Sequence, residues 1–258
     1  ARMYNHWLGG KDSFLADRVA AARIGELAPW AVDCARENRA FLGRAVRMLA
    51  DAGVDQFLDI GAGLPSAGAV HEIAQETRPD ARVVYVDNDP VVLRHAQALL
   101  ATDNRTVAVM GDVRDPYEIV SNPGVAGLLD FSRPVAVLLV ALLHFVTDAE
   151  RPAWIVRELR NAVAPGSFLV VSHGLNLSDA APEAAANQAA AQVYSQLAEP
   201  VTLRTYGQIK SLFADWELVE PGLVPVSAWR PVGESRRVSV PVLAGVARRP
   251  TNMAGGRS

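Results

Sequence analysis

A glycine-rich turn between an apolar stretch and a helical pattern limits the folds open to this chain more than any other feature. Residues 57–60 are apolar apart from Asp59, and Gly61 and Gly63 follow directly. Glycine has no Cβ, so the backbone can turn sharply here and a ligand can lie directly on it. Residues 67–74 then have a helical pattern, and the first N–H groups of a helix have no partner within it. The stretch predicts the opening of a strand–helix–strand unit with a ligand at the turn.

The spacing of the glycines separates two classes of ligand. A dinucleotide-binding turn needs Gly-x-Gly-x-x-Gly, but Ser66 stands at the third position and the next glycine is Gly68. The pattern Asp59-x-Gly61-x-Gly63 instead resembles motif I of the class I S-adenosylmethionine-dependent methyltransferases. The cofactor of that family has no phosphate, and its methionine part lies over the turn. A turn whose glycines serve packing alone stays open as an alternative.

Composition and charge exclude several functional classes. Of 258 residues, 50% are hydrophobic and 21% charged, which is enough for a sizeable core. The net charge of −3 and the pI near 6.0 give no basic surface for nucleic acid. Cys34 is the only cysteine, which excludes an internal disulfide and a cysteine metal cluster and favours the cytoplasm. The longest apolar run, residues 135–146, is too short for a membrane span, and charges interrupt the first eighteen residues, so we expect no signal peptide.

Strand and helix patterns alternate along the chain, which indicates a parallel sheet with right-handed crossovers. The expected strands are 57–60, 82–87, 107–110, 134–143, 168–172, 216–219 and 240–246. Further helices are expected from residue 29 until Gly53, and over 148–163, 182–197 and 206–216. We therefore predict an α/β, Rossmann-like fold with a seven-stranded, mostly parallel sheet, a C-terminal antiparallel hairpin and helices on both faces.

The segments outside the sheet define the domain organisation. We expect a single domain over residues 1–247 and a disordered tail over 248–258. Residues 1–28 begin with aromatic and polar side chains mixed around Gly9 and Gly10, without the period of a plain amphipathic helix. Such a mixture suits a segment that covers a polar cavity, or an arm that packs on a neighbouring subunit. Residues 180–198 are expected to form an inserted helix.

Two acidic positions follow predicted strands on the edge where open α/β sheets bind ligands. Asp87 ends the second strand, and its carboxylate can accept hydrogen bonds from both ribose hydroxyls. Because NAD enzymes use an acid in the same way, Asp87 does not separate the two cofactors, and it can also serve as a cap. Asp112 follows the third strand in Gly111-Asp112-Val113 and can accept from an adenine amino group, although aspartate is also a common loop residue.

The order of these motifs resembles that of class I methyltransferases over roughly residues 54–246. The stretch Arg2-x-Tyr4-Asn5-x-Trp7-Leu8-Gly9-Gly10-Lys11-Asp12-Ser13-Phe14 is similar to the N-terminal signature of a bacterial family. That family was once listed as a domain of unknown function and was later assigned as S-adenosylmethionine-dependent methyltransferases. The resemblance implies S-adenosylmethionine as cofactor but supplies no substrate. It implies cofactor contacts at Asp59, Gly61, Ala62, Gly63, Asp87, Asn88, Gly111, Asp112, Val113 and Ala141.

Methyl transfer to an amine or hydroxyl needs an aligned acceptor and a route for its proton. His144 and His173 follow the fourth and fifth predicted strands and are the candidate bases, since an unperturbed histidine has a pKa of about 6.5. His144 can equally well shape the pocket. The candidates for the wall of the substrate pocket are Tyr4, His6, Tyr194 and Tyr206.

The leading hypothesis is O- or N-methylation of a small-molecule acceptor. The alternatives are a cofactor-binding protein without catalysis and an NAD(P)-dependent oxidoreductase, against which Ser66 argues. Nucleic-acid methylation is disfavoured by the net charge and by the lack of an Asn/Asp-Pro-Pro-Tyr/Phe motif after the fourth strand. No spacing of His, Asp and Glu predicts a metal site, no membrane partner is expected, and assembly into a homo-oligomer is left open.

Overall fold

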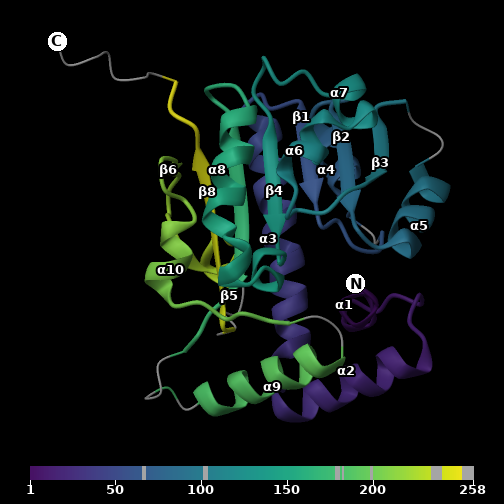
Figure 1. The fold of residues 1–258 in the computed structure, drawn as a ribbon, viewed down its shortest axis with the longest axis vertical. Coiled ribbons are helices and arrows are strands. Elements are labelled where there is room, and N and C mark those ends of the chain that lie inside the picture. Colours follow the sequence, from purple (N-terminus) through teal and green to yellow (C-terminus); the bar gives the residue numbers. More distant parts are fainter. Residues whose placement is uncertain are drawn as a thin grey trace.

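A twisted sheet forms the centre of the protein in the computed structural model (Figure 1). The structure describes residues 1–65, 68–100, 104–177, 181, 183–197, 200–233 and 240–251. The strands are β1 (Gln56–Ile60), β2 (Arg82–Asp87), β3 (Thr106–Met110), β4 (Ala136–Val140), β5 (Phe168–Gly174), β6 (Glu217–Leu218), β7 (Val224–Pro225) and β8 (Val242–Arg248). The helices are α1 (Arg2–Trp7), α2 (Leu15–Leu27), α3 (Ala31–Asp51), α4 (Val70–Thr77), α5 (Pro90–Leu100), α6 (Pro116–Ser121), α7 (Pro123–Leu128), α8 (Pro152–Ala162), α9 (Ala184–Leu197) and α10 (Tyr206–Ser211). The short 3₁₀ turns in these ranges are η1 (Leu143–Phe145), η2 (Asp148–Glu150) and η3 (Val226–Ala228).

The strand order confirms the predicted fold class. The main path of the sheet runs β3-β2-β1-β4-β5-β8-β6, and β7 pairs with β8. The pairs among β1 to β5 are parallel, whereas β8 runs antiparallel to β5, β6 and β7. The described part of the sheet has eight strands where seven were expected, because the two-residue strand β7 carries no sequence signal.

Both faces of the sheet are covered because its strands are apolar on both sides. Along β1, Leu58 and Ile60 face one core and Phe57 faces the other. Helices α6, α7, α8 and α10 pack on the first face, and α3, α4 and α5 pack on the second. The predicted helices on both faces are thereby confirmed.

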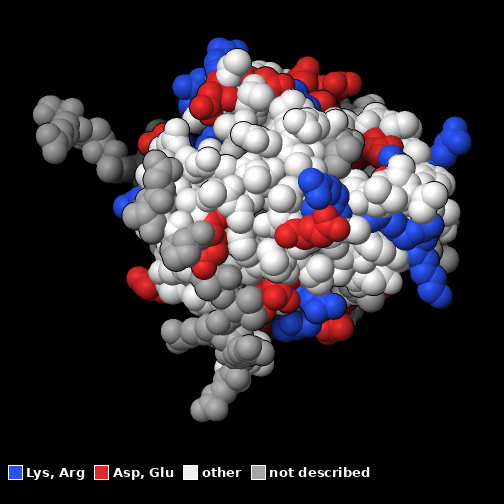
Figure 2. Space-filling model, turned by 90° about the horizontal axis from the view of Figure 1, so that it is seen from below, with Lys and Arg blue, Asp and Glu red and all other residues white. Residues whose placement is uncertain are grey.

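A third, smaller apolar cluster joins α1, α2 and α9 beyond the carboxyl ends of the parallel strands (Figure 1). Buried side chains on α1 and α2 include Met3 and Ile24, and Ala190 of α9 packs against them. Seen from this end, charged side chains are scattered and Lys and Arg do not gather on the visible surface (Figure 2). These three helices place much of the non-sheet chain at one end of the molecule.

Some element boundaries differ from the predictions for local backbone reasons. The first eighteen residues do form helices: Gly9, at φ +82°, follows the end of α1, and the Asp17 side chain accepts from the backbone N–H of Phe14 at the start of α2. Strand β4 stops at Val140 because Ala141 has a left-handed backbone with φ +54°. Likewise Arg151, at φ +54°, separates η2 from α8 within the helix expected over 148–163.

The remaining boundaries fall close to the expected ones or outside the described residues. Helix α10 ends at Ser211, earlier than expected, and turns follow it. Ser66, Ala67 at the start of the helix expected over 67–74, the ends of the inserted helix and residues 252–258 lie outside the described residues. Within the described ranges, no helix combines the length and the apolar character needed to cross a membrane.

The packing of α3 on the sheet supplies a test of the core. Phe41 is fully buried and meets the Trp229 ring edge-on, with 5.2 Å between the centroids. We expect Phe41→Ala to lower the free energy of unfolding by about 3–5 kcal/mol in urea titrations, because it leaves a cavity. Phe14 is 69% exposed and serves as the matched control. Phe14→Ala should change the free energy of unfolding by no more than about 0.5 kcal/mol. Equal losses for the two variants would contradict this packing.

Candidate active site

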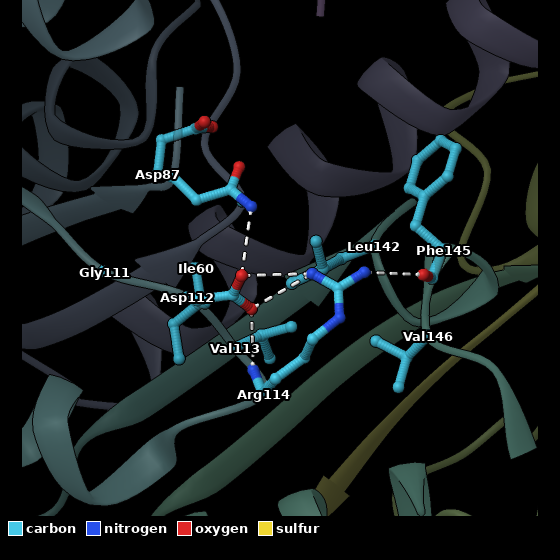
Figure 3. A pocket seen from close by; sticks show the side chains of 11 residues that line it. Ile60, Asp87, Gly111, Asp112, Val113, Arg114, Leu142, Phe145 and Val146 are labelled. Carbon is cyan, nitrogen blue, oxygen red and sulfur yellow. Dashed lines mark hydrogen bonds and ion pairs between the residues drawn. The ribbon is translucent and has the colours of Figure 1, made fainter. Parts of the chain in front are cut away.

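A pocket opens at the carboxyl ends of the parallel strands (Figure 3). It encloses about 40 Å³. Its lining comes from the ends of β1 and β2 and from the loops after β3 and β4. The lining residues are Ile60, Gly61, Asp87, Asn88, Gly111, Asp112, Val113, Arg114, Leu142, Phe145 and Val146.

The turn after β1 is held to β2 by hydrogen bonds. Gly61 and Gly63 have φ angles of +75° and +67°, which side-chain-bearing residues rarely adopt. The Gly63 N–H donates to Asp87 Oδ2 at 2.9 Å, and the Asp89 N–H donates to Asp87 Oδ1 at 3.0 Å. A Cβ on Gly61 would lie 2.6 Å from Leu142 Cδ1, whereas a Cβ on Gly63 would meet nothing within 4 Å. Gly61 is therefore needed for close packing, and the space over Gly63 is open.

Asp112 and Arg114 form the polar wall opposite Asp87 (Figure 3). Arg114 Nη1 lies 3.1 Å from Asp112 Oδ2, and Asn88 Nδ2 donates to the same oxygen at 3.2 Å. Arg114 also donates to Glu150 Oε1 at 2.6 Å and to the Phe145 carbonyl at 3.1 Å. This guanidinium ties the loop after β3 to the loop after β4.

The structure brings six of the ten predicted cofactor residues together at the pocket. They are Gly61, Asp87, Asn88, Gly111, Asp112 and Val113. Asp59, Ala62, Gly63 and Ala141 lie within two positions of a lining residue but do not line the pocket. Sequence reasoning missed Arg114, although it stands two residues after Asp112, where its N–H donates to Asp112 Oδ1 at 2.9 Å in a local turn.

Asp59 is a buried carboxylate directly behind the glycine turn. The residue is 6% exposed. Burial raises the pKa of Asp59 to about 7, against the opposing effect of the Arg39 guanidinium, and the nearby Asp87 raises it further. Such a group favours a cationic partner.

The two predicted bases lie side by side, His144 on the loop after β4 and His173 near the end of β5. The rings of His144 and His173 meet edge-on, with 5.6 Å between the centroids. Burial lowers the pKa of His144 to about 3 and that of His173 to about 4. Both imidazoles are therefore neutral near pH 7 and are weak bases.

Their hydrogen bonds distinguish the two histidines. His173 donates from Nδ1 to the Gly174 carbonyl at 2.8 Å, and its Nε2 accepts from Arg204 Nη1 at 2.9 Å. Arg204 is 2% exposed and also binds Asp148 Oδ1 at 2.7 Å. The Nδ1 atom of His144 is buried and has no hydrogen-bond partner among the described residues. His173 thus supports a buried arginine, and His144 keeps one nitrogen without a partner in the described part of the protein.

None of the four predicted pocket-wall residues lines the pocket. Tyr4 points into the protein, where its hydroxyl donates to the Ala35 carbonyl at 3.0 Å. Tyr194 of α9 reaches the pocket indirectly, with its ring 5.6 Å from that of Phe145. His6 is half-buried on α1, and Tyr206 is 50% exposed at the start of α10.

The family of the chain follows from a comparison with family models. Residues 1–250 match the model of the S-adenosyl methyltransferase family. The chain belongs to this family. A proposed methyltransferase from Thermobifida fusca has a similar structure, with a TM-score of 0.90 and 42% identity over 96% of this chain and 94% of that one. A DUF574 family protein from Streptomyces avermitilis also has a TM-score of 0.90, with 39% identity over 96% of both chains.

The fold of this methyltransferase is also found in a solved structure of much lower sequence identity. Human N-acetylserotonin methyltransferase, solved in complex with S-adenosylmethionine, has a TM-score of 0.50 and 17% identity over 96% of this chain and 62% of that one. A likeness at that identity shows the fold alone. No curated protein matches the chain. The predictions of a class I methyltransferase and of S-adenosylmethionine as its cofactor are confirmed by the family match.

The residues of the methyltransferase pocket fit this cofactor in chemistry. The buried Asp59 carboxylate suits a cationic group, and the open space above Gly63 leaves room on the backbone. Each carboxylate oxygen of Asp87 accepts one N–H and has a further lone pair for a hydroxyl.

The clash at Gly61 gives a first test of the pocket. We expect Gly61→Ala to weaken binding of S-adenosylhomocysteine at least about tenfold in calorimetric titration, because the new Cβ displaces Leu142 and strains the turn. Gly222 is the matched control, since it also has a positive φ of +87° and a Cβ added to it would meet nothing within 4 Å. Gly222→Ala should leave the affinity within about twofold. The same affinity for both variants would show that the turn does not touch the ligand.

The raised pKa of Asp59 predicts how stability depends on pH. Between about pH 4 and 7 the folded protein keeps a proton on Asp59 that the unfolded chain releases, so the free energy of unfolding falls as pH rises. Without cofactor, we expect a fall of about 2 kcal/mol between pH 5 and 7 from this group in urea unfolding. Asp59→Asn should remove that component. An unchanged slope in the variant would mean that Asp59 titrates normally.

Proposed function

We propose that the enzyme methylates an oxygen or nitrogen atom of a small molecule enclosed at the carboxyl edge of the sheet. The observation that supports the proposal most is the packing of α1, α2 and α9 against one another beyond that edge. These helices lie where an acceptor would approach the pocket, and the scattered charge of the visible end offers no basic surface for nucleic acid (Figure 2). In this structure the N-terminal segment packs on its own chain, since Tyr4 binds Ala35 of α3.

The cofactor site is proposed to comprise the ten predicted residues together with Arg114. Asp87 would accept from the ribose hydroxyls, and Asp112 with the Val113 backbone would bind the adenine. Gly61, Ala62 and Gly63 would lie under the methionine part, with Asp59 as the nearby negative charge. Asp87 and Asp112 support this assignment because they line the same pocket from different strands. S-adenosylmethionine, when bound, supplies an electrophilic methyl group on a sulfonium.

The chain's own residues are proposed to enclose and position the acceptor. Tyr194 on α9 contacts Phe145, which lines the pocket, so movement of α9 is transmitted to the lining. The helical cover would exclude water and hold the acceptor in line with the methyl group. Tyr4 and His6 would contribute to this cover rather than to the pocket lining, whereas Tyr206 lies on α10, outside the cover.

Of the two candidate bases, His144 is the better one. Both ring nitrogens of His173 are engaged, which makes it a supporting residue for Arg204. In the described part of the protein His144 has one unpartnered nitrogen, but its pKa of about 3 makes it a weak base. Its Nδ1 would take the proton that the acceptor loses as the new bond to the methyl group forms, and the imidazole also shapes the loop after β4.

Two measurements on the same preparations test the proposal. Calorimetric titration should show S-adenosylhomocysteine binding to the wild type, and Asp87→Asn should weaken it at least about tenfold because the asparagine amide replaces an acceptor oxygen by a donor. Asp80→Asn is the matched control, since that side chain is fully exposed just before β2 and should leave binding unchanged.

The second measurement identifies the acceptor class. S-adenosylhomocysteine release from S-adenosylmethionine should rise with members of a panel of small hydroxyl and amine compounds and not with oligonucleotides. Absence of binding by the wild type would overturn the assigned cofactor site. Turnover on oligonucleotides alone would overturn the small-molecule proposal.

A further inference from the structure

A continuous run of hydrogen bonds connects the N-terminal helix α1 to the backbone beside the pocket. The Tyr4 hydroxyl donates to the Ala35 carbonyl at 3.0 Å and accepts from Asn38 Nδ2 at 2.9 Å. Asn38 Oδ1 accepts from the Ser172 hydroxyl at 2.5 Å. Ser172 Oγ in turn accepts from the Ala141 N–H at 2.9 Å. The run therefore joins α1, α3, β5 and the residue that follows β4.

The middle of this run is isolated from water. Ser172 is fully buried and Asn38 is 4% exposed. A buried group that loses its partner keeps its desolvation cost and gains nothing in return. Because each hydroxyl in the run both donates and accepts, the loss of one member changes the hydrogen bonding of its neighbours.

The inner end of the run is a strained residue. Ala141 has φ +54°, a conformation that costs an L-residue with a Cβ about 1–2 kcal/mol relative to the usual regions. Its neighbour Leu142 lines the pocket and occupies the space next to Gly61. The hydrogen bond from Ala141 to Ser172 offsets the strain and thereby fixes where Leu142 stands.

The outer end of the hydrogen-bonded run is Tyr4, on the N-terminal segment. Tyr4 belongs to the aromatic and polar N-terminal stretch, and Arg2 of the same helix lies 3.1 Å from Asp17 Oδ2 and 3.8 Å from Asp89 Oδ2. Asp89 follows β2 and donates its N–H to Asp87. Helix α1 is thus connected to both sides of the pocket, to the β2 side through Arg2 and to the β4 side through Tyr4.

We propose that Ser172 and Asn38 are positioning residues that hold Ala141 and Leu142 in the binding-competent arrangement, and that Tyr4 makes this arrangement depend on the docking of α1. The N-terminal helix then does more than cover the site: its docking and cofactor binding favour each other. The proposal rests on the proposed function in one respect, since it takes the pocket as the cofactor site.

Ser172→Ala removes the acceptor of the Ala141 N–H and tests the inner end of the run. We expect it to weaken S-adenosylhomocysteine binding about tenfold. Adding Ala141→Gly should restore most of the affinity, because glycine adopts the left-handed conformation without strain. Asp215→Gly is the matched control, since Asp215 has φ +66° and is exposed on the turn after α10, and it should restore nothing.

Tyr4→Phe tests the outer end, because it keeps the ring and removes only the hydroxyl. We expect it to weaken binding about threefold, and the loss in the double variant with Ser172→Ala should be smaller than the product of the two single losses. If the wild type binds S-adenosylhomocysteine and the Ser172→Ala variant binds it equally well, the positioning role of Ser172 is overturned and the cofactor site is not. If the losses of affinity from Tyr4→Phe and Ser172→Ala multiply in the double variant, the link to α1 is overturned. If Ala141→Gly and Asp215→Gly restore the affinity of Ser172→Ala equally, Ser172 contributes only to general stability. A wild type that binds nothing would overturn the assigned site and this role together.

Discussion

Parallel pairing of β1 to β5 places five strand ends at one edge of the sheet, and the site depends on that arrangement. Asp87 closes β2, the glycine turn follows β1, and Asp112 follows β3, so residues far apart in the chain line one pocket. Hydrogen bonds then fix the loops: the Gly63 N–H binds Asp87, and Arg114 bridges the loops after β3 and β4. The chemistry of the family needs this convergence because methyl transfer is mainly a matter of alignment.

Polar groups buried at the same edge would destabilise the fold if they lacked partners. His173 and Asp148 satisfy the buried Arg204, and Asn38 satisfies Ser172. Asp59 is nearly buried as well, and burial raises its pKa to about 7 although the Arg39 guanidinium acts to lower it. A cationic cofactor beside Asp59 would favour the charged carboxylate, which connects the stability of the free protein to its ligand.

Much of the fold followed from the sequence because it depends on local signals. An apolar run around Asp59 marked β1, an apolar run ending in Asp87 marked β2, and Gly61 and Gly63 marked the turn. Their order along the chain was enough to predict the sheet, and the family match confirms the class. Strand β4 was predicted too long because nothing in the sequence shows that Ala141, an ordinary residue, takes a left-handed backbone.

The parts that escaped prediction depend on contacts between distant residues. Arg114 donates a hydrogen bond to Glu150, which lies 36 positions away in the chain, and Ser172 donates one to Asn38, which lies 134 positions away. No spacing rule covers such pairs. Helices α1 and α2 were missed for a related reason: Gly9 and Gly10 separate them, and packing on α3 and α9 stabilises them rather than periodicity of their own. The roles of the individual site residues remain predictions.

The most direct test of the central claim is a crystal structure of the protein with S-adenosylhomocysteine. The account predicts density for the adenosine between Asp87 and Asp112, with the amino-acid part over Gly61 and Gly63. Ordered ligand on any other face of the molecule would contradict it, as would adenosine bound out of reach of both carboxylates.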